Sequence, residues 1–365
     1  MKSIVRRTAL AVCTLVLALI LPTAAFAACT GFDDVPETAD CYESVMYLAE
    51  CEIAAGTGND CFSPEQLITV EQWAVMLCRA YGAETIGDSW QDVGRSSVAE
   101  AYRQGWLNET ALSAPRSPMC RSALVESAFA AADVPVYDST LYEGGASLST
   151  ADNILRVGRE LGLCTDDADA NALVTRGEAA IMLHAVLTQS LHIEEPPVPV
   201  TLVNAAGVNV NGFLLELRKV PEQVLDAFNA TGWAYCIDFD YMGGLSKKLN
   251  MSCIGATNYS RKTIYLSEAS ATLHEFGHFL DWTLGFPAEH EQLYLAEAQN
   301  SGLRDYAKTN AREYFADCFD YYITYGSSPE MLERLRENAP QTCAYFKEQR
   351  QANWTRCTDD AHCQE

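Results

Sequence analysis

Residues 272–282 read TLHEFGHFLDW, and this stretch decides how the second half of the chain is interpreted. His274 and His278 are four residues apart, so they share one face of a helix. Glu275 follows the first histidine directly, which gives the spacing of the zinc-binding H-E-x-x-H motif. Two neutral imidazoles can hold a cation, and the glutamate can reach a water bound to it. The alternative is a chance pair of histidines on a polar helix face.

The rest of this helix favours the metal site. Four apolar residues can bury the side opposite the histidines, namely Leu273, Phe276, Phe279 and Leu280. Gly277 has no side chain, so another segment can approach it closely. A catalytic zinc site also needs a third protein ligand and one open position. The sequence must therefore supply one more ligand elsewhere.

A downstream helix offers this third ligand. The metzincin pattern is excluded, because it needs glycine and histidine where the chain has Asp281 and Leu284. The gluzincin pattern needs a helical glutamate, often followed four residues later by an acid. The stretch NAREYFADCFDYY supplies Glu313 and Asp317, one helical turn apart. Asp317 would accept the free N–H of a ligand histidine and orient its ring.

Three other side chains remain candidates for the third ligand. They follow the motif within a few residues, in a segment predicted to be a loop because Gly285 and Pro287 interrupt the helical pattern. These candidates are Glu289, His290 and Glu291.

Strand and helix patterns alternate around the motif. Residues 207–220 alternate like a strand, a helix starts at Pro221, and residues 233–240 again resemble a strand. Residues 241–250 (YMGGLSKKLN) are predicted to form a glycine-bearing loop. Residues 262–266 (KTIYL) are predicted to be the edge strand along which an extended peptide would lie. Mixed strands and helices indicate an α+β domain.

The carboxyl-terminal stretch DYAKTNAREYFADCF, together with HEFGH, resembles the anthrax lethal factor-like zinc peptidases. This family includes secreted endopeptidases that cut between two prolines, and the resemblance covers roughly residues 205–350. It implies Zn²⁺ as cofactor, with His274, His278 and Glu313 as ligands and Glu275 as the general base. It also implies that Tyr306, seven residues before the glutamate, stabilises the oxyanion. Without the resemblance, Tyr306 would be taken for a core aromatic residue.

The first half of the chain is repetitive. Residues 32–82, 90–134 and 148–187 share one order of features, namely an amphipathic helix, a glycine-marked turn, a polar loop and a second helix. The stretch beginning FDDV and continuing EIAAGTGNDCFSPEQLIT resembles an S-layer homology (SLH) repeat. The resemblance implies a helical, pseudo-threefold module of three repeats that binds acidic secondary polymers of the bacterial cell wall.

Two arginines are the candidate wall-polymer residues. The basic signature of the SLH family survives as Thr175-Arg176-Gly177-Glu178, and Arg121 remains in the second repeat. Val70 replaces the arginine in the first repeat. The guanidinium of Arg121 or Arg176 suits carboxylates and phosphates, which it binds with two parallel hydrogen bonds. The alternative is that these arginines cap helices or lie in solvent.

The start of the chain predicts export. Lys2, Arg6 and Arg7 precede an apolar run, and Ala25-Phe26-Ala27 forms a cleavage signature. A weaker alternative is a lipid-bearing Cys29. No later segment is long enough to span a membrane. Of the 14 cysteines, Cys13 lies in the leader, and export makes disulfides the default expectation for the other 13.

The acidic composition excludes one class of partner. The formal net charge is −24, so the chain repels phosphate backbones and nucleic-acid binding is not expected.

These features predict a multidomain chain, in which an all-α module of three SLH repeats precedes an α+β zincin of the gluzincin-like type. The expected layout is a signal peptide (1–27), SLH repeats within 28–191 (about 30–83, 88–135 and 146–190), a proline-rich linker (192–201) and a zinc metallopeptidase domain (202–365).

The expected protein is secreted, attached to the bacterial cell wall, and hydrolyses peptide bonds in surface or extracellular proteins, including Pro-Pro bonds if the resemblance extends that far. The alternative is a wall-binding structural or adhesive protein with an inactive metallopeptidase-like domain.

Overall fold

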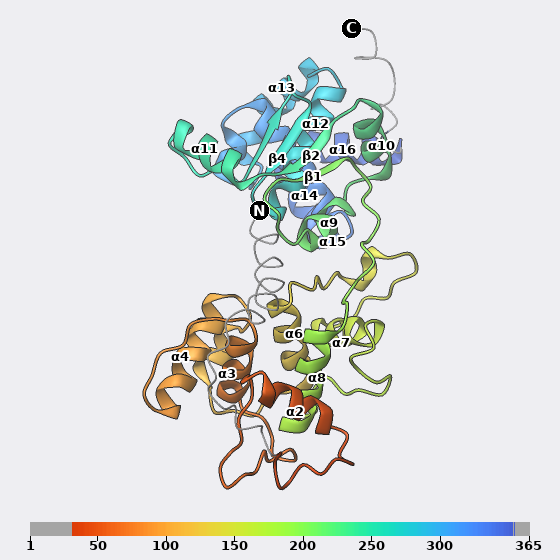
Figure 1. Ribbon diagram of the computed structural model, residues 1–365. Helices are drawn as coiled ribbons and strands as arrows, with labels where there is room; N and C mark the ends of the chain where they lie inside the picture. The colour runs from red at the N-terminus through yellow and green to blue at the C-terminus, as the bar shows by residue number, and fades with distance from the viewer. Residues whose placement is uncertain (1–30, 353, 355–365) are drawn as a thin grey trace. The chain divides into compact units, whose positions relative to one another are not determined.

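The computed structural model describes residues 31–352 and 354 (Figure 1). The predicted signal peptide and Cys29 lie outside these residues. The described chain divides into two compact units, one made of residues 31–134 and 154–193, the other of residues 135–153 and those from 194 onward. Residues 135–153 thus pack with the second unit, although they fall between the second and third expected repeats and include the start of the third.

The first unit is built from helices, and no strand lies among its described residues. Its short pairings are isolated bridges between loop segments. The helices are α2 (Tyr42–Glu50), α3 (Val70–Ala80), α4 (Trp90–Arg103), α5 (Glu109–Ser113), α6 (Arg121–Ala131), α7 (Thr150–Glu160, which begins in the second unit) and α8 (Arg176–Thr188).

The segments that lead into α3, α6 and α8 form a closed ring of backbone hydrogen bonds. The N–H of Ile68 donates to the carbonyl of Val174, that of Val174 to Met119, and that of Met119 to Ile68, each at 3.0 Å. All three side chains are buried. One closed ring of hydrogen bonds therefore joins the three helix starts around these buried side chains.

The second unit combines helices with four short strands. Its strands are β1 (Leu202–Asn204), β2 (Ala234–Ile237), β3 (Gly255–Asn258) and β4 (Thr263–Leu266). Its helices are α9 (Asn211–Leu217), α10 (Glu222–Ala230), α11 (Phe239–Leu249), α12 (Thr272–Thr283), α13 (Ala288–Glu297), α14 (Ala311–Tyr325), α15 (Pro329–Asn338) and α16 (Pro340–Gln351), with 3₁₀ turns at Ser139–Leu141, Ala269–Ala271, Ala298–Asn300 and Asp305–Lys308. Within the described part of the chain, no helix has both the length and the apolar character that a membrane span requires.

The sheet of the second unit is mixed, and its order is β1-β2-β4-β3. The first three strands in this order run parallel, whereas β3 pairs antiparallel with β4. The prediction that residues 262–266 form the edge strand is wrong, because β4 lies between β2 and β3. The edge strand beside the predicted metal site is β3, which the sequence pattern did not reveal.

Two segments adopt helices where the sequence predicted otherwise. The predicted loop at 241–250 belongs to α11, which starts because the carboxylate of Asp238 accepts a hydrogen bond from the backbone N–H of Tyr241 at 2.8 Å. The predicted strand at 207–220 contains α9 instead. Phe213, Leu214 and Leu217 of this helix are buried, and their spacing is helical.

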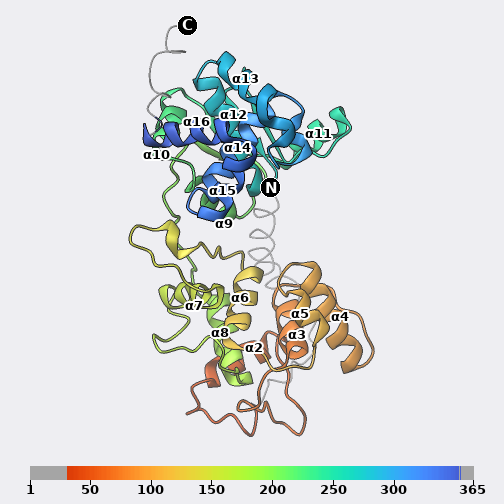
Figure 2. The same cartoon turned by 180° about the vertical axis from the view of Figure 1, so that it is seen from behind.

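The core of the second unit is aromatic and lies under α12. Phe276 and Phe279 are fully buried, and their rings lie 4.9 and 5.0 Å from the ring of Phe228. The indole of Trp233, on the residue that precedes β2, lies 5.2 Å from Phe279. The other face of α12 packs against α14, and the view in Figure 2 shows α12, α14 and α16 beside one another. This packing fixes the motif helix between the sheet and a second helix.

The described cysteines are free thiols. They are Cys41, Cys51, Cys61, Cys78, Cys120, Cys164, Cys236, Cys253, Cys318 and Cys343. The expectation of disulfides therefore finds no support between residues 31 and 352, while Cys13, Cys29, Cys357 and Cys363 lie outside the described residues.

Candidate active site

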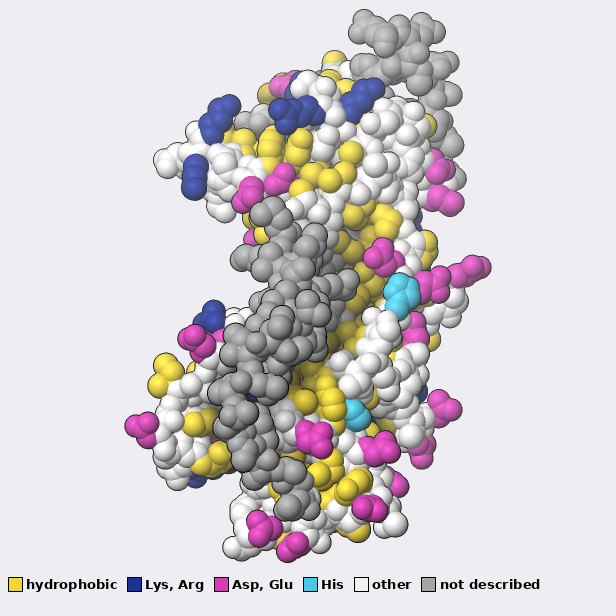
Figure 3. Space-filling model, viewed as in Figure 1, with side chains coloured by type: hydrophobic (Ala, Val, Ile, Leu, Met, Phe, Trp, Pro, Cys, Tyr) yellow, Lys and Arg dark blue, Asp and Glu magenta, His cyan; other side chains and the backbone are white. Residues whose placement is uncertain are grey.

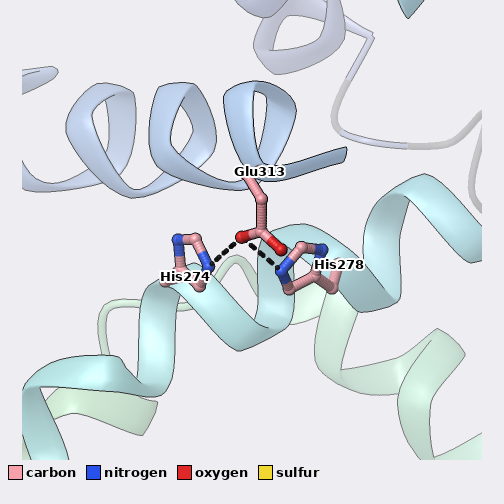
Figure 4. A group of neighbouring side chains, drawn as sticks. All are labelled: His274, His278 and Glu313. Carbon is pink, nitrogen blue, oxygen red and sulfur yellow. Dashed lines mark hydrogen bonds and ion pairs between the residues drawn. The ribbon is translucent and has the colours of Figure 1, made fainter. Parts of the chain in front are cut away.

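Helices α12 and α14 bring the three predicted ligands together (Figure 4). One carboxylate oxygen of Glu313 lies 3.1 Å from Nε2 of His274 and 3.2 Å from Nε2 of His278. The candidate ligand atoms all lie within 4.8 Å of one another. Two imidazole nitrogens and one carboxylate oxygen are the donor set of many catalytic zinc sites, so these side chains fit a zinc ion.

The close approach of the two helices depends on Gly277. A β-carbon at this position would lie 2.6 Å from the Cα of Ala316 on α14. Real β-carbons do not come this close to backbone atoms, so only glycine allows the present helix spacing. Because Gly277 lies between the histidines and Ala316 lies one turn after Glu313, this contact sets the distance between the ligands.

His274 is oriented from behind by Asp317, the second acid on α14. Its Nδ1 lies 2.6 Å from the carboxylate of Asp317. Arg304, which the sequence did not single out, donates from Nε to the other oxygen of Asp317 at 2.6 Å. Such partners fix the ring and leave Nε2 free to bind a metal. Nδ1 of His278, in contrast, is buried and has no partner among the described residues.

The pKa values indicate a site that attracts positive charge. Burial disfavours the charged form of His274, but hydrogen bonds to Asp317 and Glu313 outweigh it and raise the pKa of His274 to about 10. Burial opposes ionisation of Glu313 as well, yet its contacts with His274 and His278 lower the pKa of this carboxyl group. The ionised carboxylates thus favour a proton or a metal ion between the helices.

Glu275 is buried against the edge strand. Thr257 of β3 donates a hydrogen bond from its hydroxyl to the carboxylate of Glu275 at 2.7 Å. A β-carbon at Gly255 would lie 2.5 Å from the other carboxylate oxygen, so the strand also needs glycine here. Sequence reasoning missed both contacts, because neither position follows a motif.

Tyr306 lies beside His274 and is not a core residue. Its side chain is 40% exposed, and its ring centroid lies 6.0 Å from that of His274. Burial of part of the ring, followed by the negative charge of Glu313, raises the pKa of Tyr306 to about 12. The phenol therefore keeps its proton at neutral pH and can donate a hydrogen bond.

These side chains line one cleft with a volume of about 560 Å³. Its wall also includes Leu245 and Leu249 of α11 and Met251, which give the cleft an apolar side. Leu249 and Met251 are about half exposed. An open cleft next to the ligands leaves room for a substrate.

The three alternative third ligands do not reach the histidines. Glu289, His290 and Glu291 lie on α13 and not in a loop. Glu289 and Glu291 are exposed, whereas His290 is buried. Nδ1 of His290 lies 2.6 Å from the carboxylate of Asp281, and its Nε2 lies 2.8 Å from the hydroxyl of Tyr345.

The two candidate polymer-binding arginines lie in different surroundings of the first unit. Arg176 is buried at the start of α8, donates to the carbonyls of Phe62 and Ala55, and stacks on the ring of Phe62 at 4.5 Å. It lines a groove of about 480 Å³ with the turn at residues 53–58. Arg121 forms an ion pair with Glu178 at 2.8 Å.

Two segments of the chain match models of known protein families. Residues 239–349 match the model of the family described as anthrax toxin lethal factor, N- and C-terminal domain. Residues 31–72 match the model of the S-layer homology domain. No curated protein matches the chain. The first match contains every candidate metal-site residue, and the second covers most of the first expected repeat (about 30–83) and neither of the other two. The chain therefore carries a segment that matches the S-layer homology domain and, after it, a segment that matches the anthrax lethal factor domain.

Proposed function

We propose that this protein is a zinc endopeptidase that is secreted and held at the bacterial cell wall. The lethal factor domain implies a metallopeptidase, and the SLH domain implies attachment to the wall. The observation that carries the catalytic proposal is the convergence of His274, His278 and Glu313 beside Glu275 in one open cleft.

Each side chain has a distinct role in the proposed hydrolysis. A bound zinc ion supplies Lewis acidity for the scissile carbonyl and for the attacking water. Glu275 takes a proton from the water and later gives it to the leaving amine. Thr257 holds the carboxylate of Glu275 in place. Tyr306 keeps its proton and donates to the oxyanion that develops on the carbonyl oxygen.

The edge strand suggests how a substrate lies in the cleft. One side of β3 pairs with β4, and the other side has no strand neighbour among the described residues. An extended peptide can add to this side through backbone hydrogen bonds, which bring its carbonyl groups past Glu275. We propose protein or peptide substrates on this basis. Selectivity for Pro-Pro bonds rests on the family resemblance alone.

The proposed wall anchor is a module of three SLH repeats within residues 28–191. The match at residues 31–72 and the hydrogen-bond ring through Ile68, Met119 and Val174 support it. We propose that the groove next to Arg176 binds an acidic wall polymer. Arg121 is a weaker candidate, because Glu178 already neutralises its charge.

Zinc content and peptide cleavage together test the catalytic proposal. Purified protein is analysed for bound metal, and a proline-containing peptide library is incubated with the wild type, with Glu275→Gln and with Tyr306→Phe. We expect about one zinc per chain in all three, because neither substitution removes a ligand. Cleavage should fall below detection in Glu275→Gln and by roughly 10²-fold in Tyr306→Phe. Equal behaviour of wild type and Glu275→Gln would leave the protein as a wall-binding structural protein.

Sedimentation with purified wall polymer tests the anchor. The wild type should co-sediment, and Arg176→Ala should bind less, provided that circular dichroism shows an intact fold. Arg121→Ala should have the smaller effect. Equal binding by all three proteins would contradict the proposed groove.

A further inference from the structure

Arg312 presents a fixed guanidinium group next to the candidate metal site. The residue precedes Glu313 in the first turn of α14, and its side chain is exposed. The guanidinium carbon lies 4.1 Å from the ring centroid of Phe286 and 5.7 Å from that of Tyr259. The two rings meet edge to face at 5.5 Å. Stacking of this kind holds a guanidinium plane while its N–H groups stay free to bind a ligand.

The hydrogen-bonding capacity of this group is unused. An arginine has five N–H donors. Among the described residues, however, the side chain of Arg312 forms no ion pair or hydrogen bond, and it lies over the rings of Phe286 and Tyr259. Arg304, nine residues before Glu313, differs from Arg312 because its guanidinium is bound to the carboxylate of Asp317.

Helix stability does not explain the position of Arg312. The first turn of a helix carries partial positive charge, which favours acidic side chains and disfavours basic ones. Phe286, which supports the guanidinium, is itself in the left-handed region at φ 50°, where bulky residues are rare. A cation at an unfavourable helix position, on a strained aromatic support, is better explained by a ligand.

Arg312 is also the exception in the charge of the cleft. The ionisable acids that line the cleft are Glu275, Glu291 and Glu313, and Arg312 is the one lining residue with a permanent positive charge. The chain has a formal net charge of −24, and Figure 3 shows Asp and Glu side chains spread over the visible faces of both units. In such surroundings an unpaired arginine attracts an anionic group of a ligand.

The position of Tyr259 places the guanidinium of Arg312 near the path of a peptide bound along β3. Tyr259 directly follows β3, so a peptide paired with the edge strand continues past the aromatic support. We infer that Arg312 determines substrate specificity by binding a carboxylate of the peptide on this side of the cleft. This inference rests on the proposed peptidase function. If the peptide pairs antiparallel with β3, the carboxylate lies on the amino-terminal side of the scissile bond.

Binding to a variant that does not turn over tests this inference directly. The full chain with Glu275→Gln is loaded with zinc and titrated with fluorescent decapeptides of alternating alanine and proline, blocked at both ends. One position at a time holds Glu, Gln or Lys. At one position we expect the Glu peptide to bind about tenfold more tightly than the Gln peptide, the size of one charge-assisted interaction. A second set with a free carboxyl terminus shows whether the terminal carboxylate is bound instead of a side chain.

Substitutions at Arg312 assign the preference to this residue. Added to Glu275→Gln, Arg312→Gln should bind Glu and Gln peptides alike, and Arg312→Glu should prefer the Lys peptide. Arg336→Gln, which removes an exposed arginine on α15, should keep the Glu preference and serves as the matched control. Equal binding of Glu and Gln peptides, or a Glu preference that persists in Arg312→Gln, would overturn the inference. Because binding is measured without turnover, a failure of wild-type cleavage would count against the peptidase proposal separately.

Discussion

Gly277 and Ala316 are in contact through their backbones, and this contact brings the two ligand-bearing helices together. Gly277 has no side chain, so the Cα of Ala316 can lie close to it. A β-carbon on residue 277 would be only 2.6 Å from that Cα. The H-E-x-x-H spacing presents two imidazoles on one face of α12, and the glycine between them determines how near Glu313 can come.

Gly277→Ala should separate the helices and weaken the metal site. The added methyl group would have to displace the α14 backbone, which we expect to lower the free energy of unfolding by about 1–3 kcal/mol and to weaken zinc affinity. Thermal unfolding with and without a chelator measures both effects. Gly243→Ala is the control, because no atom lies within 4 Å of a β-carbon there and α11 should become slightly more stable. Equal loss of stability in both variants would contradict this role of Gly277.

Zinc binding should depend on Glu313 and not on the acids of α13. We expect Glu313→Ala to lose its metal during dialysis, because two imidazoles alone bind zinc weakly. Glu289→Ala should retain about one zinc per chain. Metal analysis of the dialysed proteins shows whether Glu313 or an acid of α13 is the third zinc ligand. Loss of zinc from Glu289→Ala alone would exclude the present ligand set.

Thr257→Val should slow catalysis without removing the metal. The valine has nearly the shape of threonine but cannot donate to the carboxylate of Glu275. We expect kcat to fall by roughly tenfold, with KM and zinc content unchanged, because the general base loses its orientation. Thr257→Ser keeps the hydroxyl group and should restore most of the rate. A change in KM without a change in kcat would point to peptide binding by the strand instead.

Cys78 and Cys318 should be buried thiols. Both are fully buried, and burial raises the pKa of Cys78 to about 11, so its reactive thiolate form is scarce at neutral pH. Alkylation without reductant should label the exposed Cys51 in the native protein and label Cys78 and Cys318 only after unfolding. Peptide mapping identifies the modified sites. If unfolded protein needs a reductant before Cys78 or Cys318 reacts, these residues form disulfides.

The sequence was informative where chemistry restricts spacing. The four-residue separation of His274 and His278, and of Glu313 and Asp317, implies one helix face for each pair, and the structure has helices at both places. Long-range contacts were not predictable in this way. The order of the strands, the hydrogen bond from Thr257 and the ion pair from Arg304 join residues that no local pattern relates.

Local patterns were also misleading where tertiary packing decides the structure. Gly243 and Gly244 suggested a loop, yet both belong to α11, whose ends are fixed by Asp238 and by Asn250 in the left-handed conformation. The alternation at 207–220 suggested a strand. The buried face of α9 instead follows the helical spacing of Phe213 and Leu217, which packing against α12 selects.

The ring through Ile68, Met119 and Val174 has a consequence for how the first unit can tolerate substitutions. Each segment is hydrogen-bonded to the other two, so its position does not depend on contact with a ligand. A residue such as Val70 can replace a basic residue and leave the circle closed. Deleting one segment, however, would open the ring and leave one backbone N–H and one backbone carbonyl without a hydrogen-bond partner in the interior. A substitution in one segment can therefore leave the ring intact, whereas removal of any whole segment would open it.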